Sequence, residues 1–286
     1  MTEQQELKHK RGWLVNAGNN EISIKMALAS VYTIKTFQDQ KHPIAVFLDS
    51  ADKWPSEYDW LVDYVIEYPF GDSSANMNQP QLNQWQLYHV TPFEQNILIE
   101  ADTFILGDLD YVWKLGEAKS VLLPMQITDF RDEAYMSPHT MYFQENKIKT
   151  VHAGIWYFKA KDELAETYFK MLDVVSQNWR DAFKNYLKPE HVHEWPELDT
   201  LHSITMKMVD ESDNFLVSDP RFLRYTHMIS TADTKWNDVM NTWFTNGFKI
   251  DNYRQRGVCK YTEPTVMTDV IFDGIRNNYR SANRKD

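Results

Sequence analysis

Two uninterrupted apolar runs constrain the fold of this chain more than any other feature. Residues 44–48 read IAVFL and residues 96–100 read NILIE. Strands that are apolar on both faces are typical of a parallel sheet with helices packed on both sides. Residues 24–34 place apolar side chains at helical spacing, and Asn19 or Asn20 can cap that helix. The pattern predicts a strand–helix–strand unit with a right-handed crossover.

The same alternation continues along the first 175 residues. We expect further strands at residues 13–15, 63–68, 121–123 and 154–158, and further helices at residues 82–90 and 162–175. The pattern weakens after about residue 178. The sequence therefore predicts an α/β fold with a mostly parallel sheet. We divide the chain into a polar leader (residues 1–11), a helix-flanked core (12–205) and an aromatic and basic C-terminal elaboration (206–286).

The composition narrows the class of function. The 30 basic and 41 acidic residues give a net charge of −11, which disfavours a protein that coats nucleic acid or anionic membrane with its whole surface. Residues 249–286 nonetheless carry eight basic and five acidic side chains, so a local basic site is compatible with the sequence. The lone Cys259 cannot form an internal disulfide, and no run approaches the ~20 apolar residues that span a membrane. We expect a soluble cytoplasmic protein that does not associate with membranes.

Residues 97–113 (ILIEADTFILGDLDYVW) carry the chemistry. An apolar strand ends there in Glu100-Ala101-Asp102. The carboxyl ends of strands border the binding crevice in open α/β sheets. Carboxylates in that place can hold Mg²⁺ or Mn²⁺, and the cation can neutralise a diphosphate leaving group. An acidic pair alone also fits a solvated strand end, so neighbouring motifs decide the interpretation.

Residues 84–113 resemble the central segment of GT-A glycosyltransferases, especially the glycogenin-like family 8. The match runs through an apolar strand and an acid-x-Asp element at residues 97–106 and then through Leu109-Asp110. The segment is also similar to glycosyltransferases encoded by tailed bacteriophages. They share residues 87–93, where a helix is followed by Thr-Pro-Phe and then by the strand. The resemblance implies the Rossmann-like GT-A fold, a UDP-sugar donor and transfer with retention of configuration.

Further blocks follow in the family's order. Residues 151–156 resemble the Asn-Ala-Gly element that lines the donor-sugar pocket, residues 194–202 the acidic segment beside the reacting sugar, and residues 15–18 the first strand beneath the nucleoside. The resemblance implies a set of donor-binding residues: Asn16, Ala17, Gly18, Glu100, Ala101, Asp102, His152, Ala153, Gly154, Arg256 and Lys260.

Departures from the family pattern leave roles open. The family's acidic-Gln pair is Glu197-Leu198 here, so either Glu197 or Asp199 would be the catalytic carboxylate that lies beside the anomeric carbon and stabilises the cation-like sugar. The resemblance implies Asp102 and Glu100 as ligands of Mn²⁺ or Mg²⁺, with ribose as the alternative partner of Glu100, which is longer than the family's first Asp. A His usually completes that site, whereas this chain offers Lys260, which can pair with the diphosphate directly. His227 is an alternative third ligand.

The acceptor and the oligomeric state are not determined by the sequence. The acceptor is either a glycan or the hydroxymethyl group of a modified cytosine in phage DNA, which would require base extrusion and place the protein in the host cytoplasm. Four tryptophans lie near the motifs, and we expect most in the core and at least one in the sugar pocket: Trp85, Trp156, Trp195 and Trp243. A nucleotidyltransferase of related fold and a non-catalytic carbohydrate-binding protein are the alternative functions.

Overall fold

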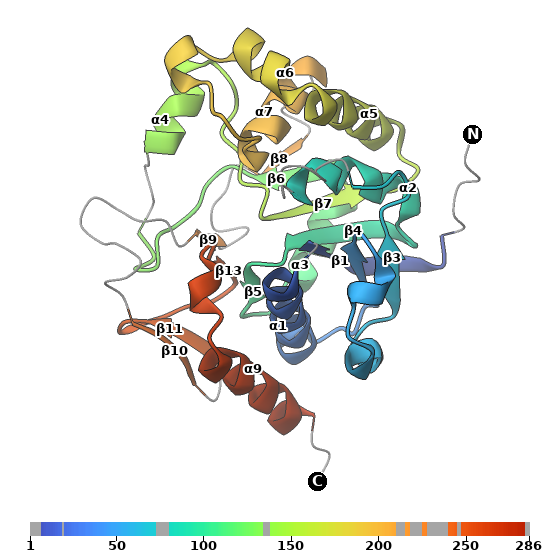
Figure 1. Ribbon diagram of the computed structural model, residues 1–286, viewed down its shortest axis with the longest axis vertical. Coiled ribbons are helices and arrows are strands. Elements are labelled where there is room, and N and C mark those ends of the chain that lie inside the picture. The colour runs from blue at the N-terminus through green and yellow to red at the C-terminus, as the bar shows by residue number, and fades with distance from the viewer. Residues whose placement is uncertain are drawn as a thin grey trace.

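A seven-stranded sheet forms the centre of the molecule (Figure 1). Its strand order is β3 (Tyr64–Glu67), β2 (Ile44–Leu48), β1 (His9–Gly18), β4 (Phe93–Glu100), β7 (Ile155–Lys159), β6 (Val121–Pro124) and β8 (Leu216–Val217). Neighbouring strands from β3 through β4 are parallel, as are β6 and β8. Strand β7 runs antiparallel to both of its neighbours. The prediction of an α/β fold with a mostly parallel sheet is confirmed.

The computed structural model describes residues 7–18, 20–72, 80–133, 138–209, 215–217, 225–227, 240–244 and 247–283. Asn19, one of the two predicted caps, and the first six residues of the predicted leader lie outside these ranges. Asn20 caps helix α1 (Glu21–Phe37), because its side chain accepts a hydrogen bond from the Ser23 backbone N–H and the Ser23 hydroxyl accepts one from the Asn20 backbone N–H.

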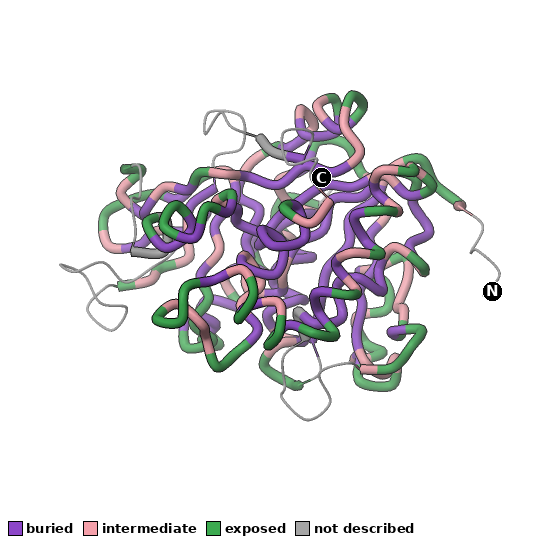
Figure 2. Tube along the Cα trace, turned by 90° about the horizontal axis from the view of Figure 1, so that it is seen from above, coloured by how far each residue is buried: buried purple, intermediate pink, exposed green. Residues whose placement is uncertain are grey.

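Helices cover both faces of the sheet (Figure 1). On one face lie α1, α3 (Asp110–Gly116) and α9 (Asp269–Ala282), and on the other α2 (Leu87–Val90), α5 (Glu163–Gln177), α6 (Trp179–Tyr186) and α7 (Leu198–Val209). Alternate strand residues enter the two cores: Val15 and Ile99 join the α1 side, while Leu14 and Leu98 join the α5 side. Buried backbone accordingly runs through the middle of the molecule (Figure 2). Within the described ranges, no helix is long and apolar enough to cross a membrane.

Several element boundaries differ from expectation. Strand β1 begins at His9, inside the predicted leader, because residues 9–12 pair with β4 through backbone groups that do not require apolar side chains. The helix expected at residues 82–90 is a 3₁₀ helix, η3 (Pro80–Gln86), followed by the single turn of α2. Helices also continue after residue 178, where the apolar pattern is weak; the first of them are α6, η4 (Pro189–His191) and α7.

Two small sheets connect the C-terminal third to this core. One contains β10 (Asn241–Phe244), β11 (Gly247–Ile250) and β12 (Tyr253–Arg254), and the other β5 (Thr103–Ile105), β13 (Val258–Lys260) and β9 (Tyr225–His227). Antiparallel pairing places Lys260 opposite Thr103, and parallel pairing places His227 beside Lys260. The Tyr261 backbone N–H also donates to the Asp102 carbonyl at 2.9 Å. Strand β13 therefore brings the C-terminal region to the end of β4. The remaining elements are α4 (Pro138–Glu145), η1 (Ala51–Lys53), η2 (Ser56–Leu61) and η6 (Pro264–Val266).

Helix α1 fixes the turn that follows β4. The fully buried Ser30 hydroxyl lies 2.8 Å from the Ala101 carbonyl oxygen and 2.6 Å from that of Thr103, so its single O–H is shared between the carbonyls on either side of Asp102. One turn later the Thr33 hydroxyl accepts from the Ile105 N–H at 3.0 Å. Side chains of α1 thus hold the backbone on which the predicted acidic motif sits.

We predict that Ser30→Ala destabilises the protein by about 1–3 kcal/mol, since it removes the O–H that the buried Ala101 and Thr103 carbonyls share. Urea denaturation of the variant and the wild type measures the difference. Ser281→Ala is the matched control, because the exposed Ser281 hydroxyl bonds only to the Asn277 carbonyl within its own helix. Equal stability of Ser30→Ala and the wild type would show that this contact does not secure the turn.

Candidate functional site

Two carboxylates and one ammonium group meet at the carboxyl end of β4. The Lys260 Nζ lies 2.8 Å from Asp102 Oδ1 and 4.0 Å from Glu100 Oε2. All three side chains are less than one-fifth exposed, at 13%, 14% and 18% for Lys260, Asp102 and Glu100. Burial alone lowers the pKa of Lys260, but the two carboxylates outweigh it and raise the pKa, so the ammonium stays charged. We call these three residues the acidic cluster.

Amide groups hold the Glu100 carboxylate from the sheet side. The Gln84 Nε2 donates to Glu100 Oε1 at 2.6 Å, and Asn16, paired with Glu100 across β1 and β4, approaches the same oxygen at 3.5 Å. The Tyr68 hydroxyl donates to Asn16 Oδ1 at 2.6 Å and fixes that amide. Burial raises the pKa of Glu100, and Lys260 opposes the rise. The predicted nucleoside strand and the acidic motif therefore form one hydrogen-bonded unit.

Asp199 lies at the other side of this sheet edge, in the first turn of α7. Its Oδ1 accepts from the Ala153 N–H at 2.8 Å, and its Oδ2 lies 3.2 Å from His152 Nδ1. The carboxylate also contributes to raising the pKa of Lys260. The structure thus brings together Asp199 and the motif at residues 152–154, two blocks that are 46 residues apart.

Gly154 permits the close approach of two groups from the C-terminal region. A Cβ atom at this position would lie 2.0 Å from the Tyr225 hydroxyl and 2.6 Å from Lys260 Cδ. The Tyr225 side chain is buried, and its hydroxyl has no hydrogen-bond partner within the described part of the chain. Burial raises the pKa of the Tyr225 hydroxyl well above its usual value, and the negative charges of Asp199, Asp102 and Glu100 add to the rise. A neutral, unpaired phenol beside a polar cluster is available to a ligand.

The other predicted residues occupy different surroundings. Glu197 accepts a hydrogen bond from the Thr200 hydroxyl and lies 4.0 Å from His193 Nε2, away from Asp199's partners. Ala17 and Ala101 are buried, and Gly18 ends β1 with a φ of +69°, which favours glycine. Arg256 is exposed on the loop before β13. His227 lies on β9 beside Lys260.

A buried polar chain behind Glu100 was not predicted from the sequence. The Tyr168 hydroxyl lies 2.6 Å from His202 Nδ1, and His202 Nε2 lies 3.1 Å from Gln84 Oε1. Since Gln84 Nε2 donates to Glu100, its Oε1 must accept, so His202 donates from Nε2 and accepts from Tyr168 at Nδ1. Burial lowers the pKa of His202 to about 3, which keeps it neutral. His202 follows Asp199 by one helical turn, and that spacing was the available signal.

The side chains of the acidic cluster supply part of the ligand shell that a divalent cation requires. Among the described residues, no group of three His, Cys, Asp or Glu side chains is arranged to hold a metal ion. Mg²⁺ commonly takes one or two protein carboxylates and completes its shell with water and substrate phosphates. Asp102 and Glu100 supply two such carboxylates, and the Lys260 ammonium already lies between them. The assignment of these residues as metal ligands, with His227 as a third, stays a prediction.

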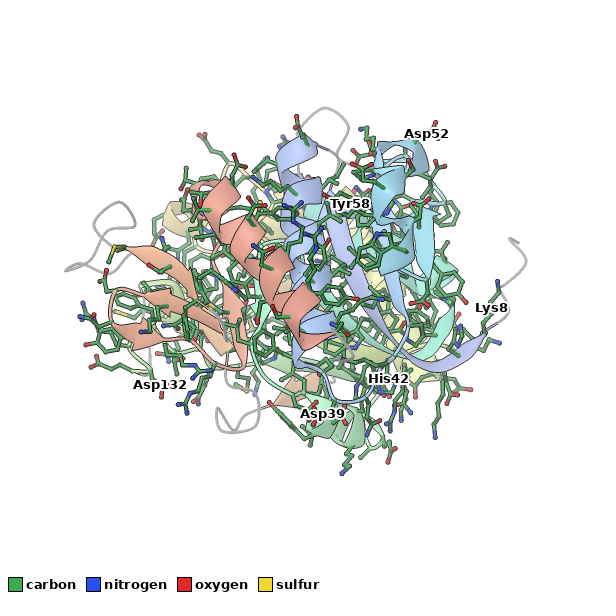
Figure 3. The ribbon with its side chains drawn as sticks, turned by 90° about the horizontal axis from the view of Figure 1, so that it is seen from below. Lys8, Asp39, His42, Asp52, Tyr58 and Asp132 are labelled. Atoms are coloured by element: carbon green, nitrogen blue, oxygen red, sulfur yellow. The ribbon has the colours of Figure 1, made fainter. Side chains whose placement is uncertain are left out.

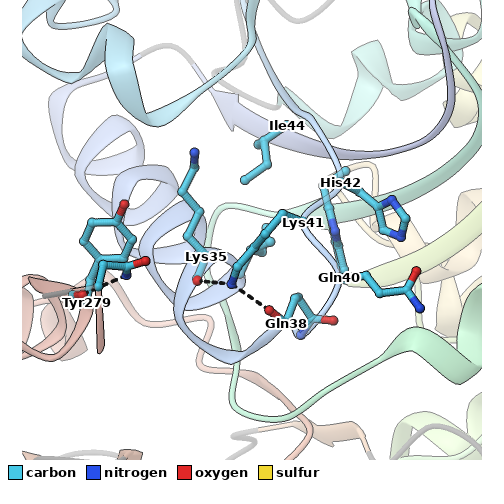
Figure 4. A pocket seen from close by; sticks show the side chains of 10 residues that line it. Lys35, Gln38, Gln40, Lys41, His42, Ile44 and Tyr279 are labelled. Atoms are coloured by element: carbon cyan, nitrogen blue, oxygen red, sulfur yellow. Dashed lines mark hydrogen bonds between the residues drawn. The ribbon is translucent and has the colours of Figure 1, made fainter. Parts of the chain in front are cut away.

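Two cavities lie at opposite ends of α1, outside the acidic cluster. One of about 640 Å³ adjoins the first turns of α1 and includes Tyr58, and the other, of about 220 Å³, lies at the far end and includes His42 (Figure 3). In the smaller cavity the Lys41 Nζ donates to the Lys35 and Gln38 carbonyls and closes the end of α1 (Figure 4). Neither cavity is lined by a residue predicted to bind donor or metal.

Tryptophan placement follows the expectation that most of the four are structural. Trp85 and Trp156 are buried, and Trp243 packs edge-on against Phe104. Trp195, by contrast, is 53% exposed, and its ring stacks on His193 with centroids 5.0 Å apart. Its neighbour Glu197 donates its backbone N–H to the Trp195 carbonyl. An exposed aromatic face therefore lies two residues before Glu197 and four before Asp199.

Comparisons with known proteins identify the fold. No protein-family model and no curated protein sequence matches this chain. The galactosyltransferase LgtC, solved with donor and acceptor sugar analogues, superposes with a TM-score of 0.54 at 12% identity, covering 96% of this chain and 97% of LgtC. Mouse xyloside xylosyltransferase 1 in its apo form gives 0.52 at 7% identity, covering 89% of this chain and 98% of that enzyme.

A third match is to only part of a larger protein. The apo form of the glycosyltransferase GlyE from Streptococcus pneumoniae TIGR4 gives a TM-score of 0.45 at 11% identity over 75% of this chain, which spans 46% of GlyE. The two full-length similarities show that the chain has the GT-A fold, as the sequence resemblance implied. A fold hosts many functions, so activity has to be argued from the site.

We predict that His202 makes folding stability pH-dependent. The unfolded chain protonates this imidazole below its usual pKa of 6.5, whereas the folded protein does so only near 3, so stability is lost as pH falls through this window. Between pH 7 and pH 5 the loss from His202 is about 2 kcal/mol. In His202→Asn the decline over this interval should be smaller by that amount, as measured by urea denaturation at both pH values. The exposed His9→Asn serves as control, and an unchanged pH slope in His202→Asn would contradict the assignment.

Proposed function

We propose that this protein is a glycosyltransferase that moves a sugar from a nucleotide diphosphate donor, a UDP-sugar, to an acceptor hydroxyl. The observation that carries the proposal is the acidic cluster: Asp102 and Glu100 flank the Lys260 ammonium at the carboxyl end of β4. In open α/β sheets this edge is where ligands bind. The resemblance of residues 97–110 to the GT-A motif and the fold itself support the same chemistry.

Donor binding follows from the charges at this edge. Asp102 and Glu100 would hold Mn²⁺ or Mg²⁺, and the cation supplies neutralisation of the diphosphate as it leaves. Lys260 offers a protein cation for the same phosphate oxygens. Asn16, Ala17 and Gly18 form the end of the adjacent strand and would border the nucleoside. The unpaired Tyr225 hydroxyl can donate to a donor oxygen beside Gly154.

Asp199 is the acid that we propose beside the anomeric carbon. Two donors orient its carboxylate, the Ala153 N–H and His152, and it shares the sheet edge with Lys260. A fixed carboxylate there stabilises the positive charge that develops on the sugar as the diphosphate departs. The acceptor hydroxyl would then attack the same face, which gives retention. The Glu197 carboxylate, held by Thr200, instead lies 4.0 Å from Nε2 of His193, whose ring stacks on Trp195.

The acceptor that we propose is a glycan. Trp195 offers an exposed aromatic face on which a sugar ring can stack, and Glu197 can accept hydrogen bonds from sugar hydroxyls. The same carboxylate, and a net charge of −11, would repel the phosphodiester backbone of DNA. Hydroxymethylated phage DNA is the competing acceptor, and parallel assays with both substrates distinguish them.

We predict that Asp102→Asn lowers the rate of sugar transfer about 10²–10³-fold or more, because the cation that would neutralise the departing diphosphate loses one of its carboxylate ligands. Turnover of labelled UDP-sugars with an oligosaccharide acceptor measures the effect. Asp108→Asn is the matched control: it removes an exposed carboxylate six residues further on and should leave the rate unchanged. Wild-type turnover in Asp102→Asn would refute the role of the acidic cluster.

The same assay separates the alternative functions. A nucleotidyltransferase would release pyrophosphate from a nucleoside triphosphate and leave UDP-sugars intact. A non-catalytic carbohydrate-binding protein would bind glycan but neither bind UDP nor consume UDP-sugar. The anomeric configuration of the product, read by proton NMR, tests retention independently of the donor sugar.

We predict that Trp195→Ala raises the KM for a glycan acceptor about two- to tenfold while the KM for the donor stays within a factor of about two, since stacking on an aromatic face contributes about 0.5–1.5 kcal/mol. Trp60→Ala is the control, because Trp60 is 58% exposed on a different part of the surface. Equal acceptor KM values for Trp195→Ala and Trp60→Ala would place the acceptor elsewhere. Transfer to hydroxymethylated DNA alone would replace the glycan by DNA as acceptor.

A further inference from the structure

The Lys260 ammonium occupies the point at which both carboxylates of the acidic cluster converge. It lies in ion-pair contact with Asp102 and at 4.0 Å from Glu100, and no more than about one-fifth of any of the three side chains is exposed. A divalent cation held by the same two carboxylates would need this position. The ammonium and the cation are therefore competitors for Asp102, since two like charges cannot share one carboxylate oxygen without strong repulsion.

The backbone and stem of Lys260 are fixed, while its ammonium end is not. Strand β13 is paired on both sides, by β5 and by β9. The stem passes Gly154 so closely that a Cβ atom there would lie 2.6 Å from Lys260 Cδ. Rotation of the last side-chain bonds can still redirect the ammonium without moving the strand.

A second observation points to a ligand at this place. The buried Tyr225 hydroxyl lies against Gly154, as the Lys260 stem does, and has no hydrogen-bond partner in the described ranges. The pKa effects connect Tyr225 electrostatically to Asp102, Glu100 and Asp199. A diphosphate entering here would give both the phenol and the displaced ammonium an acceptor oxygen.

We propose that the Lys260 ammonium occupies the position of the divalent cation whenever the donor is absent, which we call its placeholder role. Cation binding thereby depends on the donor. Without the donor, a cation must displace the ammonium from Asp102 and leave it buried without a partner. With the donor bound, the ammonium pairs with the diphosphate and the two carboxylates become available. Cation and donor then raise each other's affinity, as thermodynamic linkage requires. This inference rests on the proposed donor, and it adds a role for Lys260 besides pairing with phosphate.

The test is a titration of the full-length protein with Mn²⁺, with binding read from the electron paramagnetic resonance signal of free Mn²⁺. Each protein is titrated without nucleotide and with saturating UDP. For the wild type, we expect UDP to raise Mn²⁺ affinity about tenfold or more. For Lys260→Met, which keeps the length of the side chain and removes its charge, we expect Mn²⁺ alone to bind about tenfold more tightly than to the wild type. The enhancement by UDP should shrink by the same factor.

Lys249→Met is the matched control. It makes the same substitution at a lysine of β11 whose ammonium lies over the Phe244 ring. The net charge of the protein therefore changes by the same amount, while the ion pair of Asp102 stays intact. This control should bind Mn²⁺ as the wild type does. Equal tightening in both variants would assign the effect to net charge and overturn the proposal. Lys260→Gln provides a second variant, and thermal melting shows whether each one is folded.

The outcomes separate this inference from the proposed function. If Mn²⁺ alone binds Lys260→Met no more tightly than the wild type, while Mn²⁺ and UDP together bind both, the placeholder role is wrong and the donor assignment stands. If the wild type binds UDP neither with nor without Mn²⁺, the proposed function fails and the inference fails with it.

Discussion

The ion pair between Asp102 and Lys260 is the interaction on which the rest of the site depends. It joins residues 158 positions apart and couples the turn after β4 to the C-terminal strand β13. An isolated pair of buried carboxylates would be strongly disfavoured by desolvation, and the ammonium offsets that penalty. The same contact therefore joins the small sheet to the edge of the large one and gives the two buried carboxylates a cationic partner.

The surrounding fold restricts what this centre can do. Helix α1 holds the backbone on both sides of Asp102 through Ser30, so the carboxylate is presented from a rigid turn. On the opposite face of the sheet, α7 delivers two residues to the same edge: Asp199 reaches the Ala153 N–H, and His202 supports Gln84 behind Glu100. Both helical layers thus contribute to one polar site, although each packs mainly through its own apolar core. Such a site suits the charge stabilisation at a leaving group that we propose.

The sequence predicted the features that depend on local pattern. The continuous apolar runs of β2 and β4 identified the sheet, and the acid-x-Asp element identified the edge where the charged groups gather. The start of β1 at His9 was missed because strand pairing there uses the backbone of polar residues. The chain from Tyr168 through His202 and Gln84 to Glu100 was also missed, since its members lie up to 118 residues apart and each is unremarkable in its own segment. Separating Asp199 from Glu197 likewise needed the structure, because Glu197 immediately precedes helix α7, Asp199 lies in its first turn, and only their partners differ.

The central claim is that the donor diphosphate binds at the acidic cluster. A crystal structure of the wild-type protein with UDP and Mn²⁺ tests it most directly. The account predicts that the diphosphate lies at the carboxyl end of β4, with the cation on Asp102 and the Lys260 ammonium on a phosphate oxygen. A diphosphate bound elsewhere, for example in the cavity beside His42, with the Asp102–Lys260 pair unchanged, would contradict it.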